Sequence, residues 1–335
     1  MIFLILKKLK QIIKLCIPHG IIYLYDRPGG IHDYLYSKKY FNTFYKDKNK
    51  NNSSKVLKTI IYVADGRIKA GGLADRLRGL VSLYKISKEI KVNFKIYFTS
   101  PNDLTNYLVP NKYNWIIHSN ELIYNIKESI ILNLAFNTDE NDAINIFNNL
   151  FKKYNQLHIT TAMRTIDNEY SILFNELFKP SIELQTLIDY HLSIIDHEFI
   201  SVSFRFRTLL GDFIDGENII IKSDKQFNLI NRCLDHLDDI HFENLEYKTL
   251  VTSDSNRFLN EANKKDYVYI IPGEITHTDY SDGFDKDYFM KTFVDYFLLT
   301  YSKKNYLVLD EKMYNSGFPY RASLHRSSFI IKRYE

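Results

Sequence analysis

The chain has 335 residues, of which 45% are hydrophobic and 25% are charged, and its formal net charge at pH 7 is +4. This composition is typical of a globular protein, the length favours two domains, and so weak a net charge gives no argument for a nucleic-acid partner, so any anion site must be local. The two cysteines, Cys16 and Cys233, form neither a metal-binding spacing nor a disulfide framework, which suits structural residues in a reducing compartment.

The N-terminus combines an apolar run, residues 1–6, with lysines among further apolar residues up to Ile17. The lysines follow the apolar run, whereas a secretory signal places its charges first, and the run is much shorter than the ~20 residues of a spanning helix. We therefore predict a short amphipathic helix that either lies on an anionic membrane surface or packs against the protein body. The predicted location is cytoplasmic, and the first alternative adds peripheral contact with the inner membrane.

A polar, basic stretch over residues 37–55 is poor in aliphatic side chains, so we predict a linker before a folded body that starts near Val56. Strand-like runs then alternate with helical patterns, which indicates an α/β unit with parallel strands. Its predicted strands are 59–64, 93–99, 129–135 and 157–161, and its predicted helices are 72–88 and 141–153.

A helix-rich connection follows, with Pro180 at the expected first helical position before residues 181–195. The alternation then recurs in the second half. The predicted strands there are 199–206, 248–252, 267–271, 306–309 and 329–331, and the predicted helices are 224–238, 255–264, 287–302 and 316–326.

These elements predict an α/β fold with two Rossmann-like domains facing a cleft, preceded by the N-terminal amphipathic helix. The predicted limits are 1–55 for the N-terminal segment and linker, 56–180 for the first domain and 181–335 for the second. In open α/β sheets the ligand binds beyond the carboxyl ends of the strands, so we looked for chemistry in the loops that follow them.

The loop after the first predicted strand, within residues 65–79, holds Gly66, Gly71 and Gly72 and runs directly into a helix. Glycines let the backbone approach a ligand closely, and a helix start offers N–H groups to an anion. The segment matches neither a Walker loop nor the G-x-G-x-x-G fingerprint, and a generic strand-to-helix turn would explain its glycines. Such a turn explains its four basic residues less well: Arg67, Lys69, Arg76 and Arg78.

Two arginines, Arg205 and Arg207, stand at the end of a predicted buried strand, two residues apart and therefore on the same face. Planar guanidinium groups hydrogen-bond phosphate oxygens in pairs and stay charged, so the two side chains are a candidate fork for a diphosphate. The alternative is a structural ion pair with Asp212 or Asp215.

Two later strand ends carry small polar residues. In the turn 252–255 an acid can accept hydrogen bonds from a ribose or a base, while any of the last three residues could instead cap the following helix. Ser316 and Gly317 begin another helix, whose N–H groups could meet a phosphate.

Taken in order, these segments resemble the fucosyltransferase superfamily, which includes protein O-fucosyltransferases, α-1,6-fucosyltransferases and bacterial nodulation fucosyltransferases. Residues 71–79, Gly-Gly-Leu-Ala-Asp-Arg-Leu-Arg-Gly, are similar to the glycine loop of the family's first domain. Val202-Ser-Phe-Arg-Phe-Arg207 resembles the strand with its His-x-Arg motif, but Ser203 stands where many relatives have His. By pattern the resemblance covers residues 57–327.

The later motifs are similar as well. Thr252-Ser-Asp254 resembles the family's Ser/Asp motif, and residues 293–299 with Ser316-Gly-Phe318 resemble the end of its nucleotide domain. The resemblance implies a GT-B-like, metal-independent transferase whose donor, GDP-fucose in known members, is held mainly by the second domain. The donor-binding residues that it implies are Gly71, Gly72, Arg76, Arg205, Arg207, Thr252, Ser253, Asp254, Ser316, Gly317 and Phe318.

Each group of these residues has an implied role. Arg205 or Arg207 would neutralise the diphosphate, Asp254 would meet the nucleoside, residues 316–318 would contact phosphate, and the glycine loop with Arg76 would close the cleft. Candidates for the catalytic base are Asp75, Asp212, Glu274, His277, Asp279 and Asp282, of which we favour Asp75 or Glu274 beside a catalytic Arg205.

The sequence thus predicts a glycosyltransferase that moves a sugar, fucose from GDP-fucose being one candidate, to a glycan or lipid-linked acceptor in bacterial surface polysaccharide or capsule synthesis. The nucleotide sugar is a substrate, and we predict no cofactor, metal or nucleic-acid partner. One alternative is a transferase of the same fold with another GDP- or UDP-sugar. A second is a non-catalytic nucleotide- or glycan-binding protein, for which Ser203 is the hint. The oligomeric state stays open.

Overall fold

The structure, a computed structural model, describes residues 27–44, 57–164, 167–196, 198–216, 219–275, 277–280, 286–310 and 312–334. The predicted amphipathic helix within residues 1–26 and part of the predicted linker, residues 45–55, lie outside these ranges. By its internal contacts the chain divides into two compact units: residues 1–63, 82–97 and 115–164 form the first, and residues 64–81, 98–114 and 165–335 form the second.

Residues 37–44 were predicted to be part of a linker, but this prediction is wrong. They form the second half of helix α3 (Ile31–Phe44). Tyr40 and Phe41 of this helix are buried, and the Ser37 hydroxyl accepts the Ile131 N–H at 2.9 Å. The lysine-rich composition of the segment masked the contribution of these two aromatic residues in the sequence. They pack α3 onto the rest of the first unit, although the average hydropathy of the helix is low.

The first unit contains a four-stranded sheet in the order β2-β1-β5-β4, in which β5 pairs in parallel with both β1 and β4. The strands β1, β4 and β5 are almost continuously buried, as expected for parallel strands covered on both faces, whereas burial alternates along β2 at the sheet edge. The strands are β1 (Thr59–Ala64), β2 (Asn93–Phe98), β4 (Ser129–Leu134) and β5 (Gln156–Thr161). The helices α4 (Leu73–Glu89) and α5 (Glu140–Leu150) follow β1 and β4. The Asp139 carboxylate starts α5 by accepting the N–H groups of Asn141 and Asp142.

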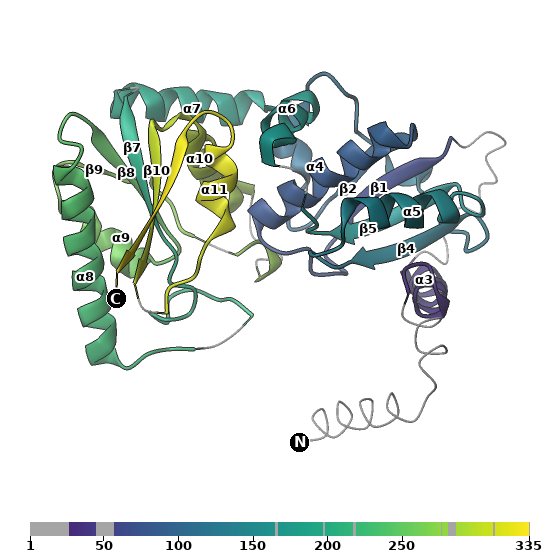
Figure 1. Cartoon of the computed structure of the whole chain (residues 1–335), viewed down its shortest axis with the longest axis horizontal. Helices are drawn as coiled ribbons and strands as arrows, with labels where there is room; N and C mark the ends of the chain where they lie inside the picture. The colour runs from purple at the N-terminus through teal and green to yellow at the C-terminus, as the bar shows by residue number, and fades with distance from the viewer. Residues whose placement is uncertain are drawn as a thin grey trace. The chain divides into compact units, whose positions relative to one another are not determined.

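The second unit contains a five-stranded, all-parallel sheet in the order β11-β10-β7-β8-β9 (Figure 1). Its strands are β7 (Phe199–Phe204), β8 (Lys248–Ser253), β9 (Val268–Tyr269), β10 (Lys304–Asp310) and β11 (Ser328–Tyr334). Its helices are α8 (Ser223–Phe242), α9 (Asn256–Ala262), α10 (Lys286–Tyr301) and α11 (Gly317–Ser323). The predicted mixed α/β fold with parallel sheets is confirmed.

The strand order of this sheet reverses beside β7. From β7 the chain proceeds through α8 to β8 and through α9 to β9, and α10 then returns it to β10 on the other side of β7. Right-handed crossovers therefore place α8 and α9 on one face and α10 and α11 on the other. The carboxyl ends of β7 and β10 form a topological switch point, where open α/β sheets bind ligands.

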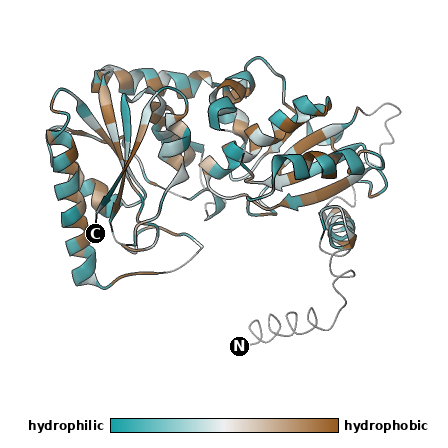
Figure 2. Ribbon diagram, viewed as in Figure 1, coloured by the Kyte–Doolittle hydropathy of each residue, from teal (hydrophilic) through white to brown (hydrophobic). Residues whose placement is uncertain are grey.

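The core of the second unit lies on both faces of this sheet. All six residues of β7 are buried, and Val202 and Phe204 pack in one cluster with Leu237 of α8, Val251 of β8 and Leu307 of β10. Figure 2 shows the corresponding pattern, with hydrophobic residues along the strands and alternating hydrophilic and hydrophobic residues along α8. This packing makes β7 a rigid base for the residues that follow it.

The second unit also contains α6 (Asp167–Leu177), α7 (Ile182–Ile195) and a two-stranded antiparallel sheet of β3 (Leu108–Pro110) and β6 (Phe178–Pro180). Pro180 was predicted to begin a helix, but it ends the strand β6. A proline fits there because it lacks only the N–H that an edge strand can spare. Ser181 caps α7 instead, with its hydroxyl accepting the Leu184 N–H at 3.2 Å. No helix within the described ranges is long and apolar enough to cross a membrane.

Candidate functional site

The turn after β7 is shaped by one buried carboxylate. The strand was predicted to reach residue 206, but it ends at Phe204 because Asp254 draws the following backbone out of the sheet. The Asp254 carboxylate accepts the N–H groups of Phe206 at 2.8 Å and Arg207 at 2.6 Å and pairs with Arg205 Nη1 at 3.0 Å. Burial raises the pKa of Asp254, while Arg205 and the two N–H groups oppose the rise. Arg207 adopts a positive φ of 54° in this turn.

The two arginines of this turn converge on a second carboxylate. Asp215 pairs with Arg205 Nη2 at 3.3 Å and with Arg207 Nε at 2.9 Å, and the two guanidinium side chains remain 22% and 26% exposed. Burial pushes the pKa of Asp215 up, but hydrogen bonds from Arg207 and Gly216 outweigh burial and lower it. The ion pair with Asp215, one of the alternatives that the sequence left open, is therefore present. The Asp215 carboxylate holds the Arg205 and Arg207 guanidinium groups side by side. We call Arg205 and Arg207 the arginine fork.

Each member of the fork also lies over an aromatic ring. The Arg205 guanidinium carbon is 4.6 Å from the Phe213 ring centroid, and that of Arg207 is 5.1 Å from the Tyr314 ring centroid. Phe213 is buried, whereas Tyr314 is 50% exposed. The rings and Asp215 together fix the directions in which the guanidinium groups point.

Capping of helix α9 falls to Ser255, whose hydroxyl accepts the Phe258 N–H at 3.1 Å. Ser253 in turn accepts the Ser255 N–H at 3.1 Å. Thr252 and Ser203 face each other across β8 and β7, and their hydroxyls hydrogen-bond at 2.8 Å in the core. The predicted nucleoside-binding turn thus has a structural partner for each side chain, and Ser203 belongs to the sheet interior.

The glycine loop before α4 surrounds an internal carboxylate. Asp279 accepts the N–H groups of Ala70 at 3.2 Å and Gly71 at 2.9 Å and pairs with Arg76 Nη2 at 2.7 Å. Arg76 also donates to the Gly71 carbonyl at 2.8 Å and the Ser100 carbonyl at 2.6 Å and is 3% exposed. In this structure the anion within the loop is Asp279, a carboxylate of the chain itself. Arg76 therefore holds the loop in shape.

His277 stands between the glycine loop and the arginine fork. Its Nδ1 accepts the Asp279 N–H at 3.1 Å, so the neutral ring carries its proton on Nε2. Nε2 lies 3.6 Å from the position that a Cβ on Gly72 would occupy. Burial first, and the positive charge of Arg205 second, lower the pKa of His277, which favours the neutral ring. The sequence alone gave His277 little weight, because a lone histidine in a loop has no local signature.

The carboxylates considered as catalytic base have different surroundings. Asp75 is 48% exposed in the first turn of α4 and pairs with Arg78 at 2.8 Å. Glu274 is exposed. Asp212 accepts the hydroxyl and an N–H at the start of α9, at 2.8 and 3.0 Å, so it is a structural residue and not the partner of the arginines. Asp282 lies outside the described residues.

The loop from β10 to α11 reaches the fork through its backbone. The Tyr314 N–H donates to the Arg205 carbonyl at 3.0 Å. Ser316 caps α11 by accepting the Phe318 N–H at 3.3 Å, Gly317 is exposed, and the Phe318 ring packs on Tyr296 with centroids 5.6 Å apart. The predicted phosphate-contacting residues 316–318 thus begin two residues after Tyr314, whose N–H is bonded to the backbone of the fork.

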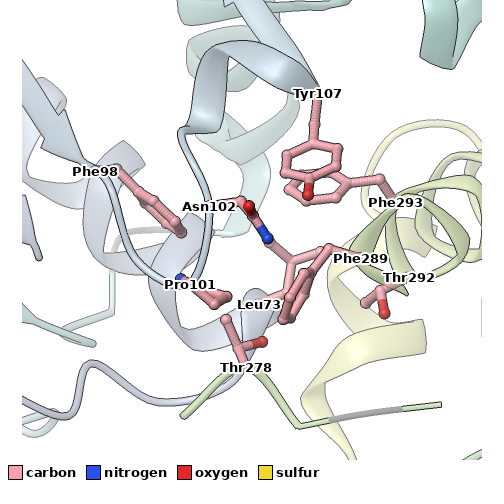
Figure 3. A pocket seen from close by; sticks show the side chains of 9 residues that line it. All are labelled: Leu73, Phe98, Pro101, Asn102, Tyr107, Thr278, Phe289, Thr292 and Phe293. Carbon is pink, nitrogen blue, oxygen red and sulfur yellow. The ribbon is translucent and has the colours of Figure 1, made fainter. Parts of the chain in front are cut away.

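A separate, small apolar pocket lies beside the first turn of α4 (Figure 3). The side chains that line it are uncharged, so it cannot neutralise a diphosphate, although Arg76 lies 5.0 Å from the Phe98 ring in its wall. Its lining residues are Leu73, Phe98, Pro101, Asn102, Tyr107, Thr278, Phe289, Thr292 and Phe293.

All of these residues belong to the second compact unit. The structure brings the predicted Arg205, Arg207, Gly71 and Gly72 into one neighbourhood with Asp215, which the sequence offered as an ion-pair partner, and with His277 and Asp279, which it offered as candidate bases. Phe213 and Tyr314 are the residues there that the sequence did not single out. Over the described part of the chain, no group of three or more His, Cys, Asp or Glu side chains is arranged to hold a metal ion.

Neither a model of a known protein family nor a curated protein sequence matches this chain at a significant level. Solved structures do. A mutant of Arabidopsis thaliana FUT1 in complex with GDP is 14% identical, with 93% of this chain and 77% of that one covered and a TM-score of 0.52. NodZ α-1,6-fucosyltransferase soaked with GDP-fucose is 14% identical, over 80% and 92% of the chains, with a TM-score of 0.49.

A third similar structure is the apo form of POFUT1, which is 10% identical over 83% of this chain and 99% of that one, with a TM-score of 0.48. At such identities the likeness concerns the fold alone. The resemblance to the fucosyltransferases that the sequence motifs predicted is confirmed at that level.

Proposed function

We propose, starting from this fucosyltransferase-like fold, that the chain is a glycosyltransferase that takes its sugar from a nucleoside diphosphate donor bound at the arginine fork. The structure of similar fold with a TM-score above 0.5 was solved in complex with GDP, which supports a guanine nucleotide as the first donor to test. Fucose from GDP-fucose is the donor sugar that we propose first.

The observation that carries this proposal is the position of the fork. Arg205 and Arg207 directly follow the central strand β7, next to the point where the strand order reverses. Two fixed, partly exposed guanidinium groups at this place match a diphosphate in geometry and in charge. They are held by Asp215 before any ligand arrives, so little reorganisation accompanies binding.

The proposed reaction transfers the sugar from phosphate to an acceptor hydroxyl. The acceptor oxygen bonds to the anomeric carbon, the bond from that carbon to the β-phosphate oxygen breaks, and the acceptor proton passes to a carboxylate base. Arg205 would stabilise the negative charge that develops on the leaving diphosphate, the role that a metal ion has in other transferases. Asp75 and Glu274, both open to solvent, stay our candidates for the base.

The wider arrangement is part of the same proposal. We propose a GT-B-like pair of domains, 56–180 on the acceptor side and 181–335 on the donor side, acting on a glycan or lipid-linked acceptor of bacterial surface polysaccharide. The lysine-bearing residues 1–26 would hold the enzyme near a membrane-embedded acceptor. Deleting residues 1–26, which leaves α3 intact, should release the protein from membrane pellets. Unchanged pelleting would contradict the membrane role alone.

A panel of nucleoside diphosphates and their sugars, measured by thermal shift and then by turnover, tests the proposal. A ligand at 100 times its Kd stabilises the native state by about 2.7 kcal/mol, which raises the Tm. Arg205→Ala and Arg207→Ala should abolish the shift in at least one variant, while Arg333→Ala, an exposed arginine on β11, should retain it. No shift with any nucleotide, or a full shift in both fork variants, would overturn the proposed site. Binding without turnover would favour the non-catalytic alternative.

A further inference from the structure

We propose that Tyr314 is the platform on which the base of the nucleoside diphosphate stacks while its phosphates lie on Arg205 and Arg207. This inference rests on the proposed function and adds the position of the base and the preferred class of nucleotide, a purine. Tyr314 is not among the site residues that the sequence predicted.

The backbone of Tyr314 is fixed at the switch point. Its N–H donates to the Arg205 carbonyl at 3.0 Å, which ties the loop after β10 to the turn after β7. The preceding residue, Met313, is buried in the core, where its sulfur accepts the Cys233 thiol at 3.6 Å. Because the Tyr314 N–H is bonded to Arg205 and the neighbouring Met313 is buried, the fold sets the position of the Tyr314 ring.

The ring itself is left open on this fixed backbone. Tyr314 is 50% exposed, one of few large aromatic side chains so placed within the described residues. The Arg207 guanidinium covers part of the ring at 5.1 Å from its centroid and is itself held by Asp215 at 2.9 Å. An open ring that the core does not use, beside a fixed cation, is available to a flat ligand group.

A planar base is the ligand group that fits this neighbourhood. Nucleobases stack on aromatic side chains and on guanidinium planes, and every base offers such a face. The fork beside the ring supplies the positive charge that the phosphates of the same molecule require. Purines have the larger face, so GDP and ADP should gain more from Tyr314 than UDP does.

Calorimetric titration of the full-length protein with GDP and with inorganic pyrophosphate, which has no base, separates the two parts of the site. Tyr314→Ala should raise the Kd for GDP about tenfold or more, the effect of losing one base stack, and change that for pyrophosphate less than about twofold. Tyr314→Phe should retain GDP binding. Arg205→Ala should weaken both ligands, and Phe242→Ala, which removes an exposed ring at the end of α8, should weaken neither.

The outcomes distinguish this inference from the proposed function. If GDP binds the wild-type protein and Tyr314→Ala equally well, the platform is overturned while the donor site stands. An equal loss for GDP and pyrophosphate would mean that Tyr314 supports only the fork, which also overturns the inference. Failure of GDP and UDP to bind the wild-type protein would remove the proposed function, and the platform with it. A UDP-to-GDP Kd ratio that Tyr314→Ala leaves unchanged would contradict the purine preference.

Discussion

Single carboxylates decide the geometry of the candidate site. Asp254 accepts two backbone N–H groups of the turn and pairs with the Arg205 side chain, Asp215 pairs with both side chains of the arginine fork, and Asp279 accepts N–H groups of the glycine loop. The sequence predicted Arg205 and Arg207 because their spacing at a strand end is a local pattern. It also offered Asp215 as an ion-pair partner of the arginines. It could not assign the partners of Asp254 and Asp279, because these acids come from other loops and meet the fork or the glycine loop only in the folded chain.

Asp254 should be among the most sensitive positions for stability. Its removal leaves Arg205 without a buried partner and two backbone N–H groups unsatisfied, so Asp254→Ala should cost about 3–5 kcal/mol of unfolding free energy. Asp224→Ala, an exposed acid in the first turn of α8, should cost less than about 0.5 kcal/mol. Urea denaturation of both variants measures the difference, and equal midpoints would contradict the structural role of Asp254.

His325 should make stability depend on pH. It lies among the rings of Tyr170, Phe174 and Tyr296, and burial first, then Arg326, lower its pKa from 6.5 to about 4. Because the folded pKa is the lower one, the unfolded chain binds the extra proton between these values, and stability falls as the pH falls from 6.5 towards 4.

The slope from this one group is at most about 1.4 kcal/mol per pH unit. Unfolding free energies at pH 7.5, 6 and 5 should therefore decline less steeply in His325→Phe than in the wild-type protein. Parallel slopes for His325→Phe and wild type would refute the assignment.

At the scale of elements, the sequence predicted best where burial is continuous. Strand β1 was located at its observed bounds and β10 was found, because each contains a short, continuous apolar run of the length typical of a buried strand. The misses have local causes. Residues 205–206 left the strand because Asp254 binds the turn, and the three-residue strands β3 and β6 are too short to show a periodic pattern.

In the glycine loop, the backbone conformation at position 71 requires a glycine. Gly71 has a φ of 86°, and a Cβ there would lie 3.0 Å from the Cβ of Asp75. Gly71→Ala should therefore cost about 1–3 kcal/mol and weaken nucleotide binding if the loop closes over the donor. Gly317→Ala has open space around it and should change stability little. Thermal melts with and without GDP test both variants, and equal melting curves would contradict the requirement at Gly71.

At the scale of the whole molecule, two observations point to one place. The strand order of the five-stranded sheet puts the topological switch point at the carboxyl ends of β7 and β10, and the side chains there form the arginine fork with an exposed aromatic ring beside it. The sequence located the fork and named His277 as one of several candidate bases, while the position of Tyr314 beside the fork comes from the tertiary structure.

A crystal structure of the full-length protein with GDP tests this account most directly. The account predicts density for the diphosphate within hydrogen-bond distance of the Arg205 and Arg207 guanidinium groups, at the carboxyl ends of β7 and β10. A nucleotide bound elsewhere, with the fork still closed on Asp215 alone, would contradict it.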